Sequence, residues 1–434
     1  MREMKNSGFS WLGEIPKNWS MQRVKHGFTR KNEKAMRENP VILSLARTGV
    51  KVRDISNNEG QIAESYFNYN PVEPGDLLLN PMDLYSGANC SVSNVSGVIS
   101  PAYINLKSKD DINPFFYDYY FKVQYWMMAF FSYGKGVSFD NRWTLNAETL
   151  MNYPIVALPY DEQCKIADYL DKKCSKIDAI IEKQQAVIEK LKEYKLSVIT
   201  EAVTKGLKSD TAMKDSEIPW IGSINASYDL AKIGTFCFVT KLAGFEYTDT
   251  MEQNISDDAE VPIVRAQNVR MHWFNDEINE FIPMDVSKKL SRCALDKKCL
   301  LITFIGAGIG DVCLFDKSIR YHLAPNVAKI VIRDEFKETI DEEYLMYYLS
   351  SYAGKGEINK ISKASAQPSL SMGTIRGIRF VLPTKDIQIK ISAILNEKCN
   401  KINKNIENRQ KIIEKMSTYK KSLIYEVVTG KKEV

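Results

Sequence analysis

The sequence predicts an α+β protein, in which two mixed α/β domains are separated by two long helices that pair as an antiparallel coiled coil. Three observations support this fold class. The chain has 434 residues, of which 44% are hydrophobic and 26% charged, and this suffices for the cores of roughly two to four domains. Its two halves repeat one another. Each repeat ends in a long segment whose apolar residues recur at helical spacing.

The internal repeat is considered first because it changes the meaning of every local motif. Two short motifs occur twice in the same order: Trp11-Leu-Gly-Glu-Ile15 with Trp220-Ile-Gly-Ser-Ile224, and Ser100-Pro-Ala102 with Ala324-Pro-Asn326. Near the ends of the repeats the displacement is a constant 225 residues, which relates Gln163, Leu170, Ile177, Tyr194 and Ile199 to Gln388, Leu395, Ile402, Tyr419 and Ile424. We infer two copies of one unit of roughly 215 residues.

The repeat divides the chain into four regions. We place a first mixed domain at residues 1–158, a central helical region at 159–208, a second mixed domain at 209–383 and a C-terminal helical region at 384–434. Short apolar runs bounded by Gly, Pro and Asn predict strands at 41–45, 76–79, 102–106, 261–264, 300–304 and 327–332. The aromatic-rich segments 117–131 and 341–352 predict helices whose rings pack in the core.

The two helical regions show a seven-residue apolar period. In the first, one seam position holds Leu170, Ile177, Leu191 and Val198, and its partner position holds Ile166, Ile180, Val187 and Tyr194. In the second, the corresponding sets are Leu395, Ile402, Met416 and Leu423, with Ile391, Ile412 and Tyr419. Each helix is expected to contain about 44 residues and to extend ~65 Å. The seam is wider than two positions, because Ile181, Ile188, Ile406 and Ile413 extend it. Neither helix could pack alone, so we expect them to pair with one another.

Composition excludes several classes of protein. No apolar run approaches the ~20 residues that cross a bilayer, and the N-terminus lacks the apolar stretch of a signal peptide. The eight cysteines form no CxxC pair, and with only three histidines there is no ligand set at zinc spacing. We therefore expect a cytoplasmic protein with reduced thiols and no metal site.

Motifs typical of enzymes are incomplete. Gly306-Ala-Gly308-Ile-Gly310 resembles the glycine-rich turn of a cofactor-binding fold, but a strand-like run follows it where that turn requires a helix, so we predict a hairpin or tight turn. Asn80-Pro-Met-Asp83 lacks the second proline and the aromatic residue of the amino-methyltransferase loop. No P-loop is present. These observations indicate that the chain has no catalytic site of its own.

Charge is unevenly distributed along the chain. The total is +5, made of +2 in residues 1–158, +1 in 159–208, −4 in 209–383 and +6 in 384–434. The window 17–53 contains ten basic and two acidic residues. A basic face of this kind can neutralise phosphates.

The arrangement of regions, with Trp-[Leu/Ile]-Gly-x-Ile opening each repeat, resembles the DNA-specificity subunits of type I restriction–modification systems. The tract from Leu158-Pro-Tyr-Asp-Glu-Gln163 to Glu201-Ala-Val-Thr-Lys-Gly206 is similar to the central conserved region of that family. The segment from Leu382-Pro-Thr-Lys-Asp-Ile-Gln388 onward is similar to its C-terminal counterpart. The resemblance covers the whole chain, and the helical tracts carry it more specifically than the globular parts.

The resemblance implies a function for each region. Two target-recognition domains would each read one half of a bipartite site in double-stranded DNA, and the helices would fix the unread spacer. The chain would be non-catalytic and would direct methyltransferase and restriction subunits to the target. S-adenosylmethionine, ATP and Mg would bind those partner subunits and not this chain. Because Asn225 and Tyr228 replace Pro16 and Trp19, symmetric contacts with the partners are not expected.

Candidate DNA contacts follow from side-chain chemistry, since Arg, Lys, Asn and Gln read base edges and Arg, Lys, Ser and Thr contact phosphates. In the first domain the candidates are Arg47, Lys51 and Arg53, with Lys135, Ser138, Asn141 and Arg142 in a glycine-containing loop. At matching positions in the second domain they are Arg265, Gln267, Asn268 and Arg270, with Lys363, Ser365 and Gln367 in a loop. We predict no catalytic and no metal-binding residues.

Two other functions remain open from the residues alone. One is an S-adenosylmethionine-dependent DNA methyltransferase that uses the turn at Gly306–Gly310, and such a chain would bind S-adenosylmethionine. The other is a helical protein-interaction scaffold without DNA binding, whose assemblies would show no salt-dependent affinity for DNA.

Overall fold

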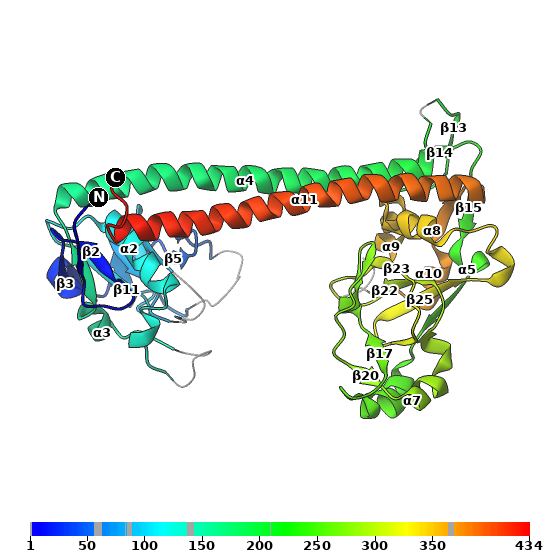
Figure 1. The fold of residues 1–434 in the computed structure, drawn as a ribbon, viewed down its shortest axis with the longest axis horizontal. Coiled ribbons are helices and arrows are strands. Elements are labelled where there is room, and N and C mark those ends of the chain that lie inside the picture. The colour runs from blue at the N-terminus through cyan, green and yellow to red at the C-terminus, as the bar shows by residue number, and fades with distance from the viewer. Residues whose placement is uncertain are drawn as a thin grey trace. The chain divides into compact units, whose positions relative to one another are not determined.

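The computed structural model describes residues 2–55, 63–82, 84, 89–136, 143–208, 210–362 and 369–434. The chain forms two compact units (Figure 1). Unit 1 contains Met1–Gln185 together with Gln410–Val434, and unit 2 contains Ala186–Arg409. Both divisions fall inside long helices, so each unit contains the beginning of one long helix and the end of the other.

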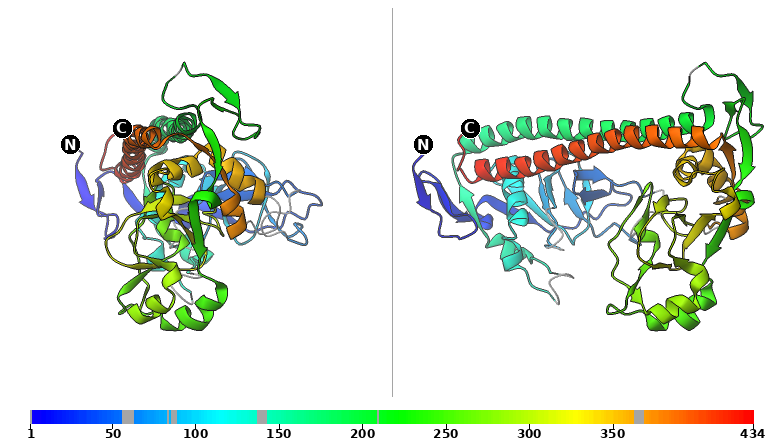
Figure 2. Two further views of the ribbon diagram at one scale, coloured as in Figure 1. Left: turned by 90° about the vertical axis from the view of Figure 1, so that its right-hand side faces the viewer. Right: turned by 45° about the vertical axis from the view of Figure 1, so that its right-hand side comes forward.

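The two predicted long helices are confirmed as α4 (Tyr160–Lys205) and α11 (Lys385–Val428). In unit 1 the Lys420 ammonium donates to both carboxylate oxygens of Asp178 at 2.7 Å. In unit 2 the Lys195 ammonium donates to Oδ1 of Asn403 at 3.0 Å. From Asp178 to Lys195 the residue number rises along α4, while that of the partner in α11 falls from 420 to 403. The helices are therefore antiparallel within each unit (Figure 2).

The predicted seven-residue period is confirmed, but one of the two seam positions was assigned wrongly. Ile180 and Tyr194 of α4, and Ile412 and Tyr419 of α11, are exposed. The positions that are not exposed include 177, 184, 191 and 198 with 181, 188, 195 and 202 in α4, and 395, 402, 409, 416 and 423 with 399, 406, 413, 420 and 427 in α11. The first set in each helix is the predicted one, and the second set contains Ile181, Ile188, Ile406 and Ile413, which we expected to widen the seam. Both sets repeat every seven residues, the period typical of a coiled coil.

Unit 1 is built on a four-stranded antiparallel sheet of β4 (Phe28–Lys31), β11 (Ile104–Ser108), β8 (Leu77–Leu79) and β9 (Cys90–Val92), in that order. The aromatic helix α2 (Pro114–Trp126) packs against it, and most of its rings are buried as predicted, although Phe115 is exposed. Four residues of the α11 end, Leu423, Ile424, Val427 and Val428, join the same core.

Unit 2 repeats this sheet as β16 (Cys237–Lys241), β25 (Val327–Ile332), β22 (Cys299–Thr303) and β23 (Val312–Phe315). Helix α8 (Glu342–Ser350) takes the place of α2, and Ile199 and Val203 of α4 complete the core. A second sheet follows the order β20 (Phe281–Ile282), β17 (Val261–Val264), β24 (Tyr321–Leu323) and β21 (Ala294–Leu295).

The repeat extends to individual buried hydrogen bonds. Gln163 accepts the backbone N–H of Asn113 at 2.8 Å, and its amide donates to the carbonyls of Asp111 and Leu158. Gln388 makes the matching set with residues 341, 339 and 383. Gln163 thereby fixes the start of α4 to the start of α2, and Gln388 fixes the start of α11 to the start of α8. A buried amide that lost these partners would cost free energy, which explains why both copies retain it.

The glycine-rich turn is confirmed as a hairpin. Strands β22 and β23 pair antiparallel on either side of it, with Ile302 opposite Val312. Gly306 and Gly310 adopt φ of 100° and 86°, which L side chains rarely adopt. No helix follows the turn directly, so the strand–turn–helix arrangement of a dinucleotide site is absent from this part of the structure. Within the described residues, no helix is long and apolar enough to span a membrane, no cluster of metal-ligating side chains occurs, and all eight cysteines are free.

The end of α11 lies against the beginning of the chain. Gly430 has φ of 72°, and a Cβ built on it would lie 2.3 Å from Cγ of Pro16. Gly13, in the same unit, has a similar φ of 68°, but its Cβ would approach only the Lys431 ammonium, at 3.8 Å. Both glycines have a positive φ, but only Gly430 lies so close to a neighbouring side chain that a Cβ would overlap it.

This difference predicts unequal effects of substitution by alanine. Gly13→Ala should cost about 1–2 kcal/mol, because a left-handed residue with a Cβ is strained. Gly430→Ala should cost about 1–3 kcal/mol more, because the added methyl group overlaps Pro16. Urea unfolding followed by circular dichroism measures both. Equal losses for the two variants would contradict the close contact.

Candidate nucleic-acid interface

Unit 1 presents a two-stranded ribbon of β5 (Leu43–Ala46) and β6 (Gly49–Val52). Ala46 pairs with Gly49, so Arg47 and Thr48 form the turn, and Ser44 lies opposite Lys51. Leu43 and Leu45 are buried in a small core of their own, which anchors the ribbon from one side. The amide of Asn89 donates to the carbonyl of Leu45 at 3.0 Å and secures the same strand.

The ribbon places three of the predicted DNA contacts. The side chains of Arg47 and Lys51 are exposed, and Arg53 is half-buried just after β6. Of the predicted loop, Lys135 is exposed and its backbone pairs with Thr144. Ser138, Asn141 and Arg142 lie outside the described residues.

The basic window 17–53 contributes less free charge than its composition suggests. Lys31 is buried and donates to Asp76 at 2.8 Å and to Glu73 at 3.0 Å. Burial disfavours its charge, but these hydrogen bonds outweigh burial, and the pKa of Lys31 is raised. Lys17 pairs with Glu3 at 2.8 Å. Of the exposed cations of the window, Arg47 and Lys51 lie in the ribbon, whereas others such as Arg30 and Arg37 lie outside it.

In unit 2, Arg265 directly follows β17 and is held from two sides. Its Nε donates to Oε2 of Glu280 at 2.6 Å, and one terminal nitrogen donates to the Tyr247 hydroxyl at 3.4 Å. The guanidinium also lies 5.9 Å from the Tyr247 ring centroid. This arrangement fixes the direction of the guanidinium, while 30% of the side chain stays exposed.

The next residues of unit 2 divide between structural and exposed roles. Asn268 is buried: its Oδ1 accepts the Arg265 N–H, and its amide donates to the carbonyls of Asn275 and Glu277 at 3.0 Å. It therefore secures the segment and presents no side-chain atom to solvent. Gln267 and Arg270 are exposed. Lys363, Ser365 and Gln367 lie outside the described residues.

Unit 2 also contains a two-stranded ribbon, formed by β18 (Val269–Arg270) and β19 (Trp273–Phe274). Arg270 pairs with Trp273, so the turn again contains two residues, Met271 and His272. The two ribbons follow equivalent positions, because Ile42 pairs parallel with Val98 as Ile263 pairs parallel with His322. This register matches Arg265 with Ser44, which is not one of the candidate contacts of unit 1.

Sequence analysis missed His272 and Trp273. His272 has φ of 70°, its Nε2 lies 2.6 Å from the Ser350 hydroxyl, and its ring centroid is 5.2 Å from that of Tyr347. Burial, with Lys195 and Lys355 nearby, lowers the pKa of His272 to about 3. Trp273 is 56% exposed. A histidine in a two-residue turn is a weak sequence signal, since Gly or Asn usually takes the left-handed position.

Comparisons with known proteins agree with this architecture. Residues 239–415 match the family described as type I restriction modification DNA specificity domain. The specificity subunit of the type I restriction enzyme MjaVIII from Methanocaldococcus jannaschii is 24% identical over 367 residues, which cover 83% of this chain and 80% of that protein.

One solved structure shows the same fold. Its chain, from work on complex assembly and conformational transition of the type I R-M system, superposes with a TM-score of 0.68 at 11% identity. The match covers 95% of this chain and 98% of that chain. The HsdS subunit from Thermoanaerobacter tengcongensis, also 11% identical, covers 96% and 98% with a TM-score of 0.48.

The low pKa of His272 predicts how stability depends on pH. Between about pH 6.5 and pH 3 the unfolded chain binds a proton that the folded chain does not, so the free energy of unfolding falls as pH decreases. We expect His272→Asn to lose less stability than the wild type between pH 7 and pH 5, and thermal unfolding measures this. His26→Asn, at an exposed position, is the control. An unchanged pH dependence in His272→Asn would contradict the buried neutral imidazole.

Proposed function

Because this chain belongs to the specificity subunits of type I restriction–modification systems, we propose that it binds a bipartite DNA target and reads one half with each unit. We further propose that it directs methyltransferase and restriction subunits to that target. The observation that supports this most directly is the repeated reading element. Each unit carries the same four-stranded sheet and, after an equivalent strand, a two-stranded ribbon with an exposed arginine.

The shape and charge of the ribbons suit this role. The major groove of DNA admits a two-stranded ribbon, and arginine pairs with two acceptors of guanine there. Arg47 and Lys51 in unit 1, and Gln267 and Arg270 in unit 2, offer base-reading and phosphate-binding groups within a few residues of each other. Because DNA would be bound through two local surfaces, the chain as a whole needs no large positive charge, which agrees with its net charge of +5. The exposed cations of the two ribbons favour DNA reading over a scaffold that binds protein alone.

We assign the chemistry of the complex to the partner subunits. In this proposal the methyltransferase and restriction subunits hold S-adenosylmethionine, ATP and Mg, and this chain holds none of them. The glycine-rich turn supports that division, because it connects two paired strands and offers no helix N-terminus to a cofactor. The proposal accordingly treats the chain as non-catalytic.

Methylation mapping tests the division into halves. The chain is co-expressed with its methyltransferase subunits, and methylated adenines are located by sequencing. Arg47→Ala with Lys51→Ala should change one half of the methylated motif, and Gln267→Ala with Arg270→Ala should change the other half. Arg265 is not substituted here, because its pairing with Glu280 would mix a structural loss with a recognition loss.

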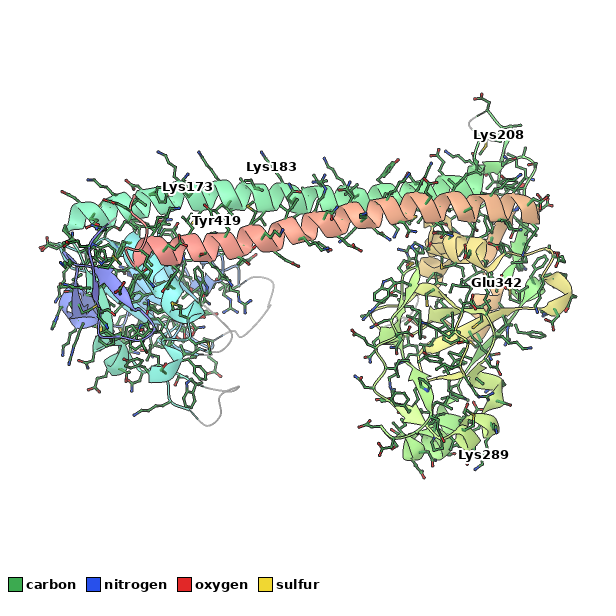
Figure 3. All side chains as sticks on the ribbon, viewed as in Figure 1. Lys173, Lys183, Lys208, Lys289, Glu342 and Tyr419 are labelled. Carbon is green, nitrogen blue, oxygen red and sulfur yellow. The ribbon has the colours of Figure 1, made fainter. Side chains whose placement is uncertain are left out.

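A matched control uses a cation outside both ribbons. Lys289, on α7 (Met284–Lys289), is exposed and points into solvent (Figure 3), so Lys289→Ala should leave the motif unchanged. If either double variant altered both halves alike, while its thermal stability matched the wild type, the assignment of one half to each unit would be wrong.

Salt dependence tests the phosphate contacts separately. Each phosphate that the protein neutralises adds about 0.9 to the slope of log affinity against log salt. Arg47→Ala with Lys51→Ala should therefore reduce this slope by up to about two in filter binding of the assembled complex. A parallel loss of affinity at every salt concentration would show that neither side chain contacts a phosphate.

A further inference from the structure

The ribbon of unit 2 presents an indole that the core does not use. Trp273 is the most exposed of the six tryptophans of the chain. It forms the last cross-strand pair before the turn, opposite the exposed Arg270. It is unfavourable to expose a large apolar side chain to water. At the tip of a ribbon and next to an arginine, such a side chain can pack against base edges and thymine methyl groups.

The turn that carries Trp273 is strained and firmly held. A left-handed φ is unfavourable in a residue with a Cβ, and such strain persists only where the surroundings impose it. Here the His272 N–H donates to the carbonyl of Val312 at 2.9 Å, while its ring contacts Ser350 and Tyr347. The Tyr347 hydroxyl in turn donates to Oδ1 of Asn396 at 2.6 Å. These contacts tie a ribbon of only two residue pairs to β23, α8 and α11.

The surroundings of the ribbon are suited to a nucleic-acid backbone. A hollow of about 520 Å³ borders Trp273, and Lys195, Asn400 and Asn403 contribute donors to its walls, with Glu407 as the acidic group. Lysine and amide donors are typical phosphate contacts. The ribbon thus combines an arginine for base reading, an exposed indole, and cationic and amide donors beside them.

We propose that Trp273 determines specificity in the half-site read by unit 2, where its indole packs against base pairs, and that His272 positions the ribbon for this contact. This inference rests on the proposed function and deepens it by naming the side chains. Trp273 touches the DNA, whereas His272 acts through the geometry of the turn.

The test uses the complex assembled with methyltransferase subunits and compares two exposed aromatic residues of unit 2. Trp273→Ala should weaken binding of the cognate target at least about tenfold and relax the unit 2 half of the methylated motif, while the other half stays intact. Phe238 is 60% exposed on β16, with the Arg333 guanidinium 4.7 Å from its ring centroid, so Phe238→Ala is the control and should change affinity less than twofold. Trp273→Phe should bind with intermediate affinity.

His272→Asn separates positioning from stability. Asparagine tolerates the left-handed backbone but lacks the ring that contacts Tyr347. We expect discrimination at the unit 2 half-site to fall at least about fivefold while the unfolding temperature at pH 7.5 changes by only a few degrees. A loss of stability without a loss of discrimination would show a purely structural histidine and overturn this assignment.

Three outcomes overturn the role of Trp273. The first is an unchanged motif and affinity in both Trp273→Ala and Trp273→Phe. The second is loss of methyltransferase capture by folded Trp273→Ala, which would identify a protein-docking residue. The third is equal relaxation of both halves. If the wild-type complex itself gave no bipartite motif, the proposed function would fail, and this result is distinct from all three.

Discussion

The structure depends on an exchange of helix ends between the two copies of the repeat. The first core contains the beginning of α4, at Ile166 and Leu170, together with the end of α11, at Leu423 and Val427. The second core contains the reverse combination, with the beginning of α11 and the end of α4. Burial of these side chains is the main favourable term for each unit. Neither globular part can therefore complete its core from its own half of the sequence.

Polar groups at the helix beginnings make this exchange specific. Gln163 and Gln388 each satisfy one donor and two acceptors at the junction between sheet, short helix and long helix. The hydroxyls of Tyr117 and Tyr344 donate to the carbonyls of Val156 and Val381 at 2.8 and 2.7 Å in the same two places. Because unpaired buried polar groups are costly, these bonds set the direction in which each long helix leaves its domain. The two ribbons do not take part in these junctions, so they can differ between the units.

Much of the fold could be predicted from the sequence because it is periodic or repeated. The long helices, the strands near 77–79 and 327–332, and the hairpin at Gly306–Gly310 agree with the expectations. The error in the seam has a simple cause. The second seam position lies three or four residues after the first, and Ile180 and Ile181 are both apolar, so only the exposure of Ile180 and Tyr194 separates the two choices.

The candidate interface was less predictable, because residue type does not reveal whether a polar side chain is already engaged. Asn268 and Lys31 have the chemistry of DNA contacts, yet each is buried in hydrogen bonds with its own unit. Conversely, His272 and Trp273 gave no signal, since their importance comes from a backbone angle and from exposure at the tip of a two-pair ribbon. Those properties depend on tertiary contacts with Ser350 and Tyr347.

The division of unit 1 between residues 1–185 and 410–434 also has a consequence for synthesis on the ribosome. Unit 2 is continuous and has all its residues once position 409 has emerged, whereas unit 1 lacks Leu423, Ile424 and Val427 until those later residues have emerged as well. The N-terminal part of the chain, although made first, therefore completes its core last. Until then the apolar face at Ile166, Leu170 and Ile177 stays uncovered, and during this interval the nascent chain is most exposed to aggregation and most dependent on chaperones.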